Sequence, residues 1–296
     1  MKQFAIIGPT ASGKSDLAIK IAKKIDAYIL SIDSLSIYKE IDIVSAKPSK
    51  AELQEIKHFG IDVLYPDQYF SAEIFIQLYK DVVKKCQEDK KNLIIVGGTS
   101  FYLKSLLAGL SPLPNITPTI QKNVQEKLKN LPQTYQYLFH LDPHYMQKID
   151  KNDRYRIEKA LLIYEASHQT PTQWFTQNPP QPIIKTLPVF NIEISRDILR
   201  QRIDKRTHKM VELGLIDEIC YLETKYSRLP NSMKSIGIKE VLEFLDLKVS
   251  KEKMIENISI HTAQLAKRQQ TFNKTQFQNI ISAPLEILEK NILSSL

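Results

Sequence analysis

The feature that most constrains this chain is the segment "GPTASGKS" at residues 8–15, which follows the apolar run "QFAII". Its spacing of Gly8, four residues, Gly13, Lys14 and Ser15 is that of a phosphate-binding loop between a strand and a helix. The glycines permit a tight turn in which backbone N–H groups and the helix N-terminus point at an anion. Lys14 adds a positive charge, and the Ser15 hydroxyl suits a magnesium ion. The segment predicts phosphate binding without identifying the phosphate compound.

Strand and helix patterns alternate along the first third of the chain. Strands are predicted at 27–32 and 92–98 and, less clearly, at 61–64, and helices at 12–25, 72–86 and 99–108. Such alternation is typical of a parallel sheet with right-handed crossovers.

Two proline clusters then interrupt the alternation. "GLSPLPNITP" carries three prolines and "NPPQPIIKTLP" carries four, and only helical patterns lie between them. We therefore predict an α/β fold with a P-loop parallel sheet core, an inserted small all-helical subdomain and a helical C-terminal region. The core is expected at 1–111 and 183–296, and the insertion at 112–182. After one more strand in "KTLPVFNIEI", the rest of the chain is predicted to be helical, with a last helix over 251–272.

Composition limits the kind of partner and the cellular environment of the chain, but it does not indicate a reaction. The net charge of +8 suits a polyanionic partner, although it also suits an ordinary basic surface. Cys86 and Cys220 are isolated from each other, which favours neither a disulfide framework nor a metal site. No run approaches the ~20 apolar residues of a membrane span, and no signal-peptide layout is present. We expect a cytoplasmic monomer that does not enter the membrane.

The position of the available carboxylate separates this chain from ordinary P-loop ATPases. Those enzymes need an acidic residue at the end of a neighbouring strand, but "LIIVGGT" ends in two glycines and Thr99. Asp33 instead follows "YILSI". Since ligands lie beyond the carboxyl ends of parallel strands, Asp33, Thr99 and the phosphate loop should converge on one cleft. Asp33 is then a magnesium ligand, a general base or a simple cap of a turn.

Eight motifs in order resemble those of the tRNA dimethylallyltransferases, also called tRNA isopentenyltransferases. They are "GPTASGKS" (8–15), "DSLSIY" (33–38), "AKP" (46–48), "VGGTSFY" (96–102), "ND" (152–153), "RIDKR" (202–206), "SIGIKE" (235–240) and "TAQLAKRQ" (262–269). The phosphate loop alone occurs in many families, whereas the ordered set is specific and extends over nearly the whole chain.

The resemblance implies prenyl transfer from dimethylallyl diphosphate to N6 of adenine 37 in tRNAs that read codons beginning with U. The diphosphate- or nucleotide-binding residues would be Gly8, Pro9, Thr10, Ala11, Ser12, Gly13, Lys14 and Ser15. Asp33 would be the general base, and Thr99 would bond near the reacting centre. Arg206, together with Mg²⁺ on Ser15, would stabilise the departing diphosphate.

The resemblance also implies a tRNA-binding surface that extrudes the target base and reads the anticodon loop. Its expected residues are Asp33, Ser34, Leu35, Ser36, Thr99, Tyr155, Arg156, Ile157, Glu158, Lys159, Lys234, Ser235, Ile236, Gly237, Ile238, Lys239, Gln264, Lys267 and Arg268. Arg156 and Lys159 are expected to meet phosphates, and the insertion is expected to grip the anticodon loop.

The chain departs from the family pattern in several places that bear on tRNA affinity more than on the reaction. Ser36 replaces a common Gln, Val44 a glycine, Ile238 an aromatic residue and Phe272 a Trp, and Gln121 stands where a basic residue is common.

Three alternatives remain at this stage. A small-molecule P-loop kinase would share the loop and the sheet, and an isopentenyltransferase acting on free AMP, ADP or ATP would share Asp33 as well. A non-catalytic RNA-binding module would not need Lys14 and Asp33 in one cleft. The basic C-terminal helices and the insertion favour tRNA as the acceptor. His58 receives no role, and Trp174 is expected in the core.

Overall fold

The computed structural model describes residues 1–295, which divide into two compact units. The first unit comprises Met1–Leu107 and Ile184–Leu296, and the second comprises Ala108–Ile183. The second unit is inserted between α4 (Ser100–Ala108) and β5 (Val189–Ile192). The predicted limits of the insertion, 112 and 182, fall just inside the second unit.

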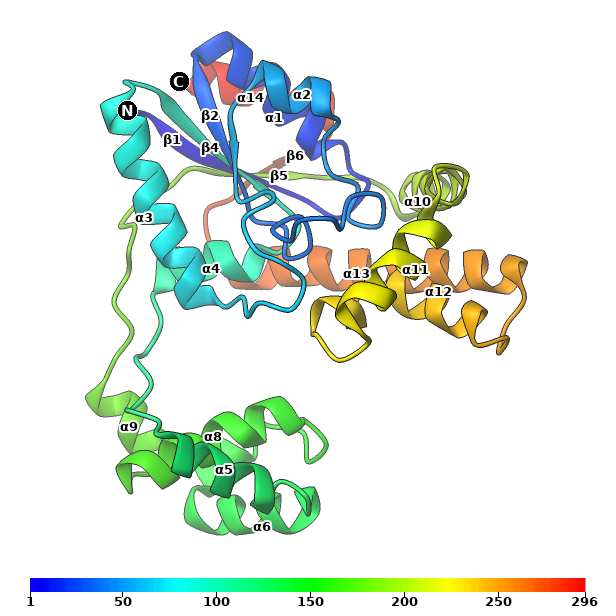
Figure 1. The fold of residues 1–296 in the computed structure, drawn as a ribbon. Coiled ribbons are helices and arrows are strands. Elements are labelled where there is room, and N and C mark those ends of the chain that lie inside the picture. Colours follow the sequence, from blue (N-terminus) through cyan, green and yellow to red (C-terminus); the bar gives the residue numbers. More distant parts are fainter. Residues whose placement is uncertain (296) are drawn as a thin grey trace. The chain divides into compact units, whose positions relative to one another are not determined.

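The first unit is built on a six-stranded sheet in which all neighbouring strands are parallel. The strand order is β3 (His58–Phe59), β2 (Ala27–Ser31), β4 (Asn92–Gly97), β1 (Gln3–Ile7), β5 and β6 (Ile281–Ala283) (Figure 1). Ile7 lies opposite Gly97, and Ser31 lies opposite Val96. The carboxyl ends of β1, β2 and β4 therefore share one edge, which is where such sheets bind ligands.

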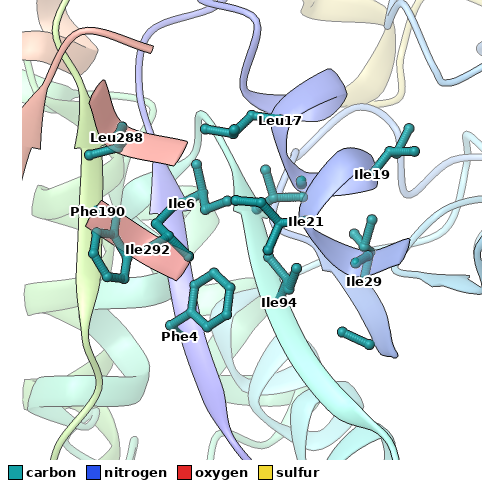
Figure 2. Packing of buried hydrophobic residues seen from close by; sticks show 14 of the residues in the cluster. Phe4, Ile6, Leu17, Ile19, Ile21, Ile29, Ile94, Phe190, Leu288 and Ile292 are labelled. Carbon is teal, nitrogen blue, oxygen red and sulfur yellow. The ribbon is translucent and has the colours of Figure 1, made fainter. Parts of the chain in front are cut away.

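One face of this sheet is covered by α1 (Lys14–Ile25) and α14 (Leu285–Ser295) (Figure 1). The apolar residues of α1 recur at spacings of three and four, so they form one buried stripe. Figure 2 shows this stripe packed against strand and α14 side chains, which include Phe4, Ile6, Phe190, Leu288 and Ile292. This packing fixes where α1 starts, and hence where the phosphate loop lies.

Helices cover the opposite face as well, where α3 (Ala72–Glu88), α4 and α13 (Lys251–Gln276) lie (Figure 1). A separate apolar cluster joins α13 to α10 (Arg196–Glu212), α11 (Leu215–Tyr226), the 3₁₀ turn η1 (Ser232–Lys234) and α12 (Ile238–Leu245). Its buried residues include Met210, Leu215, Ile219, Val241 and Ile258. The predicted α/β class with helices on a parallel sheet is confirmed.

The second unit contains helices only: α5 (Pro118–Lys127), α6 (Leu131–Leu141), α7 (Pro143–Met146), α8 (Arg154–Ser167) and α9 (Pro171–Gln177). Each begins after a side chain that caps it, namely Thr117, Asn130, Asp142, Asp153 and Thr170. Proline stands in the first turn of four of them, where its missing N–H costs nothing. Leu138, Met146, Ile157 and Leu161 anchor a separate core.

Several sequence-based predictions of elements are wrong in detail. The expectation of helices alone after β5 missed β6 and α14, and the last predicted helix, α13, continues to Gln276. The predicted strand at 61–64 is a loop in which only Leu64 bridges to Tyr38, whereas the short strand β3 precedes it. The short helix α2 (Lys50–Glu55) was also missed. Among residues 1–295, no helix is long and apolar enough to cross a membrane.

Candidate active site

The phosphate loop lies between the end of β1 and the start of α1. Ala11 and Gly13 both have left-handed backbone, with φ of 61° and 89°, and Gly13 directly precedes the helix. Within the loop, the N–H of Ser12 donates to the carbonyl of Pro9 at 3.3 Å, and Lys14 Nζ donates to the same carbonyl at 3.2 Å. The loop is therefore shaped mainly by its backbone, and it leads directly into the N-terminus of α1, where free amides favour an anion.

Asp33 follows β2 at the same edge of the sheet and shapes a turn. Its Oδ1 accepts hydrogen bonds from the N–H groups of Leu35 at 2.9 Å and Ser36 at 3.2 Å. In the described part of the chain, the second oxygen, Oδ2, makes no hydrogen bond. Asp33 is therefore a turn former with one oxygen and has a second oxygen available for chemistry.

A small cavity of about 70 Å³ brings the two segments together. Lys14, Ser15 and Thr10 line it from the phosphate loop, Asp33 lines it from the β2 turn, and Arg206 reaches it from α10. Its other lining residues include His58, Ser45, and Ala46 and Pro48 of the motif "AKP", none of which was expected at this cavity.

A larger cavity of about 300 Å³ shares Thr10, Asp33, Ser45 and Arg206 with the small one. Its other walls come from the β2 turn, from Thr99 after β4, from residues 234–237 and from α13. The Thr99 hydroxyl accepts from the N–H of Ser34 at 3.3 Å. Asp33 and Arg206 thus line both the cavity beside the phosphate loop and the larger cavity, and the expected convergence of Asp33, Thr99 and the phosphate loop is observed.

Positive charge in the small cavity is partly desolvated. The pKa of Lys14 is lowered to about 8, mainly by burial; the carboxylate of Asp33 opposes this shift, and the nearby charge of Arg206 adds to it. Burial also lowers the pKa of Arg206, again opposed by Asp33. Arg206 Nη1 donates to the hydroxyl of Thr10 at 3.3 Å, so α10 reaches back over the phosphate loop. The site is prepared for an anion that would restore the lost solvation of these cations.

Sequence reasoning missed the contacts of Gln269, which connects α13 to the phosphate loop and to the end of β4. Its Oε1 accepts from the N–H of Thr10 at 2.9 Å, and its Nε2 donates to the carbonyl of Gly98 at 3.0 Å. The motif "TAQLAKRQ" ends on this residue, so the position was marked although the contact was not foreseen. His58 was also missed; its Nδ1 lies 2.7 Å from the carbonyl of Ile56, and burial lowers its pKa.

The predicted tRNA-contacting residues of the first unit fall into three groups: residues that line the larger cavity, exposed residues outside it, and the buried Ser36 and Ile238, of which Ser36 lines the small cavity. Ser34, Leu35, Lys234, Ser235, Ile236 and Gly237 line the larger cavity. Gln264, Lys267 and Arg268 are exposed on α13 outside it, and Lys239 is exposed on α12. Ile238 is fully buried in the cluster around α12, so a direct contact of its side chain with RNA is excluded.

In the second unit, the segment 155–159 opens helix α8. Tyr155 is 66% exposed, and Arg156 pairs with Asp153 at 2.5 Å. Lys159 Nζ lies 5.6 Å from the centre of the Tyr155 ring. Glu158 accepts from Gln125, whereas Ile157 is fully buried and belongs to the core of the unit. Direct contact with RNA is therefore open to Tyr155, Arg156 and Lys159, but not to the side chain of Ile157.

The oxygen-bearing side chains that line the small cavity include the hydroxyl of Ser15 and the carboxylate of Asp33, which could face a magnesium ion. Residues 1–295 contain no group of three or more His, Cys, Asp or Glu side chains that could hold a metal by themselves. Mg²⁺ commonly binds through one or two protein oxygens together with phosphate oxygens and water. The donor set fits such a substrate-bridged ion.

Comparison with known proteins gives one family. A model of the family described as IPP transferase matches residues 36–276. A protein of Sulfurimonas denitrificans named tRNA dimethylallyltransferase is 68% identical over 296 residues, which cover both chains completely. A protein of the same name from Sulfurovum sp. is 55% identical over 99% of this chain and 98% of its own.

Solved structures agree with these sequences. A tRNA delta(2)-isopentenylpyrophosphate transferase from Staphylococcus epidermidis is 31% identical, with a TM-score of 0.70, over 100% of this chain and 98% of that one. A eukaryotic dimethylallyltransferase acting on tRNA has a TM-score of 0.80 at 27% identity, over 92% of this chain and 70% of that one. The relatives cover the phosphate loop, which lies outside the matched part of the family model.

Proposed function

This chain belongs to the IPP transferase family, and we propose that its two joined cavities transfer a dimethylallyl group from dimethylallyl diphosphate to N6 of adenine 37 of a tRNA. The small cavity holds the diphosphate, and the larger one receives the adenine. The observation that carries this assignment is the position of Asp33, which lines both cavities and keeps Oδ2 available.

Asp33 acts as the general base in this proposal. An adenine amino group is a weak nucleophile because its lone pair is delocalised into the ring, so removal of its proton must accompany bond formation. Oδ1 holds the turn through the N–H groups of Leu35 and Ser36, which orients the carboxylate toward the cavities. Oδ2 takes the proton from N6 while the N–C bond forms.

The phosphate loop serves a leaving group rather than a hydrolysed phosphate. As the allylic C–O bond breaks, negative charge grows on the bridging oxygen of the diphosphate. Lys14, the loop amides and Arg206 meet this charge from the walls of the small cavity. Ser15 would hold a magnesium ion on the diphosphate, and the ion would supply further charge neutralisation there. The absence of an acid after β4, where Gly98 and Thr99 stand, agrees with chemistry that activates no water.

The larger cavity suits an extruded base that arrives on an anticodon loop. Its volume of about 300 Å³ admits a purine, and Lys234 and Ser235 line its outer wall. The exposed Lys267 and Arg268 on α13 extend this surface with positive charge for the RNA backbone. The second unit contributes Tyr155, Arg156 and Lys159 as further contacts with the anticodon loop. A monomer working in the cytoplasm, where tRNAs are used, is sufficient for this reaction.

The test uses labelled dimethylallyl diphosphate, magnesium and an anticodon stem-loop carrying A36, A37 and A38. Label is expected in the A37 stem-loop and in neither AMP nor a G37 stem-loop. Asp33→Asn should reduce the rate by about 10²–10⁴-fold. Asn keeps an oxygen that accepts from the N–H groups of Leu35 and Ser36, so tRNA binding should be unchanged. Label in AMP would assign the chain to a free-nucleotide acceptor, and rapid transfer by Asp33→Asn would remove Asp33 as the base.

A further inference from the structure

Residues 41–48, which we term the dividing loop, form a wall shared by the two cavities. Val44 and Ser45 line the larger cavity, and Ser45, Ala46 and Pro48 line the smaller one. The conformation of this loop therefore sets the shape of both cavities at their junction, beside Asp33.

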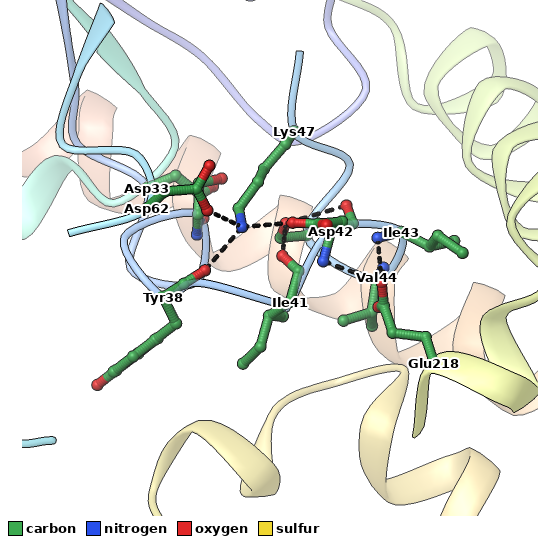
Figure 3. Close-up of polar contacts among 11 residues, drawn as sticks. Asp33, Tyr38, Ile41, Asp42, Ile43, Val44, Lys47, Asp62 and Glu218 are labelled. Atoms are coloured by element: carbon green, nitrogen blue, oxygen red, sulfur yellow. Dashed lines mark hydrogen bonds and ion pairs between the residues drawn. The ribbon is translucent and has the colours of Figure 1, made fainter. Parts of the chain in front are cut away.

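Glu218 on α11 holds one end of the dividing loop by its backbone. Its Oε2 accepts from the N–H groups of Asp42 at 2.9 Å and Ile43 at 2.7 Å, and its Oε1 accepts from that of Val44 at 3.0 Å (Figure 3). Three consecutive N–H groups thus converge on one carboxylate. Hydrogen bonds to an ionised acceptor are roughly twice as strong as neutral ones. No ion pair to Glu218 occurs among residues 1–295, so its charge is directed at the loop.

Lys47 holds the other end of the loop from inside. Its side chain is only 5% exposed, and its Nζ donates to Asp42 Oδ1 and Asp62 Oδ1 at 2.6 Å and to the carbonyl of Tyr38 at 2.7 Å (Figure 3). Between the two ties, Ala46 has left-handed backbone with φ of 48°. A residue with a Cβ disfavours this conformation. It is held by the contacts of Glu218 and Lys47 together with backbone hydrogen bonds from Ala46 N–H to the Ile43 carbonyl at 3.0 Å and from Lys47 N–H to the Asp42 carbonyl at 3.3 Å.

The dividing loop also touches a segment expected to contact tRNA. A Cβ built on Gly237 would lie 2.4 Å from Val44 Cγ2, so the Val44 side chain rests directly on the Gly237 backbone. Gly237 has φ of 93°, and the neighbouring residues 234–236 line the larger cavity. A shift of the dividing loop would therefore disturb the wall on the acceptor side as well.

We propose that Glu218 and Lys47 are positioning residues that keep the allylic carbon facing adenine N6 and shielded from water. This inference rests on the proposed function. In the productive step, the N6–C bond forms, the C–O bond to diphosphate breaks, and the N6 proton passes to Asp33. If the dividing loop moves, a water oxygen attacks the same carbon and the products are dimethylallyl alcohol, diphosphate and a proton. Protection of such a reactive centre depends on excluding water.

The experiment measures diphosphate release and prenyl transfer to the A37 stem-loop in the same sample of Glu218→Gln. Transfer is expected to fall by about tenfold to a hundredfold, because a small misplacement of reacting groups is costly. Diphosphate release should fall less, so that release exceeds transfer. Affinity for the stem-loop should stay within about twofold, since binding depends mainly on phosphate contacts.

The matched control is Asp217→Asn, which removes a neighbouring exposed carboxylate of α11 and should leave transfer and release equal. Glu218→Asp keeps the charge at a shorter reach and should lie between the wild type and Glu218→Gln, which tests the idea if the latter folds poorly. If a folded Glu218→Gln sample releases diphosphate and transfers the prenyl group in equal amounts, the proposal is overturned, however slow the transfer is. Absence of transfer by the wild-type enzyme would instead reject the proposed function.

Discussion

The two loops that enclose the small cavity are held by different means. The phosphate loop, residues 8–15, is shaped largely by its own backbone, through left-handed Ala11 and Gly13 and the bond from Ser12 N–H to the Pro9 carbonyl. Side chains outside the loop add single hydrogen bonds, from Arg202 and Arg206 and to Gln269, and the loop takes part in no ion pair among residues 1–295. The dividing loop, residues 41–48, has internal hydrogen bonds as well, such as that from Ala46 N–H to the Ile43 carbonyl, but it is also held by ionised side chains. One of these side chains lies on a helix more than 170 positions away in the sequence.

This difference separates the roles of the charges in the two loops. Lys14 makes only one hydrogen bond within the phosphate loop, at 3.2 Å to the Pro9 carbonyl, and it has no ion pair among residues 1–295, so its charge is available to the substrate. Lys47 is already neutralised by two aspartates, and its charge serves the fold of its loop. Removing a lysine should therefore damage chemistry in one loop and structure in the other.

The largest effect is expected for Lys14→Met. Loss of one donor that stabilises developing charge costs about 10²–10³-fold in kcat. Stability to urea should be unchanged or slightly higher, because a desolvated charge is removed. Single-turnover transfer to the stem-loop measures the first quantity, and urea unfolding measures the second. Lys20→Met, which removes an exposed lysine of the same helix paired with Glu289, is the control. A normal rate for Lys14→Met would show that the phosphate loop does not stabilise the leaving group.

Lys47→Met should show the opposite pattern. The carbonyl of the buried Tyr38 loses its donor, and the exposed Asp42 and Asp62 lose their partner. An acceptor left unsatisfied in a buried residue costs about 1–3 kcal/mol in the free energy of unfolding. Diphosphate release should also exceed prenyl transfer, as for Glu218→Gln. Lys50→Met, an exposed lysine at the start of α2, should change neither quantity. If Lys47→Met is as stable as the wild type and releases diphosphate only as fast as it transfers the prenyl group, the dividing loop keeps its shape without this lysine.

Gly13→Ala tests the backbone-held loop directly. Gly13 has φ of 89°, and an added Cβ would lie 3.0 Å from Leu285 Cδ1, so the substitution should cost about 1–2 kcal/mol of stability. Gly214→Ala imposes a similar left-handed strain, φ of 96°, at the start of α11, where the added Cβ has room. Both variants should lose stability in urea unfolding. Only Gly13→Ala should bind the donor more weakly, and equal donor affinity would contradict control of the phosphate site by backbone shape.

The contrast between the loops also explains what could be predicted from the sequence. The geometry of the phosphate loop is local, so Gly8, Gly13 and Lys14 were enough to predict it. Asp33 could be placed beside the loop because ligands lie beyond the carboxyl ends of parallel strands. Arg206 came from the family resemblance, and its place in the small cavity agrees with that assignment. The roles of these residues stay predictions until variants are measured.

Long-range ties could not be predicted in the same way. Nothing near Glu218 in the sequence indicates that its carboxylate binds three N–H groups of residues 42–44, because that pairing arises only when α11 packs onto the core. Gln269 is similar, since its motif marked the position but not its bond to Thr10. β6 was missed because a three-residue strand with two exposed positions carries almost no periodic signal.

The smallest effect is a pH dependence that should be confined to the phosphate loop. Burial lowers the pKa of Lys14 to about 8, so the free enzyme loses this charge well below the ordinary value of 10.5. Relative to its value at pH 7, kcat/KM for the donor should fall about twofold by pH 8 and about tenfold by pH 9, because only the protonated amine meets the diphosphate. The residual activity of Lys14→Met should lack this fall.

Stability should respond to pH in the opposite direction over the same interval. Between about pH 8 and 10.5 the unfolded chain keeps the Lys14 proton that the folded protein has released, so the free energy of unfolding rises with pH there. Subtracting the urea-unfolding profile of Lys14→Met from that of the wild type isolates this contribution from other titrating groups. A difference that is flat up to pH 10 would mean that the Lys14 ammonium remains hydrated. The desolvation that distinguishes it from the aspartate-paired Lys47 would then be absent.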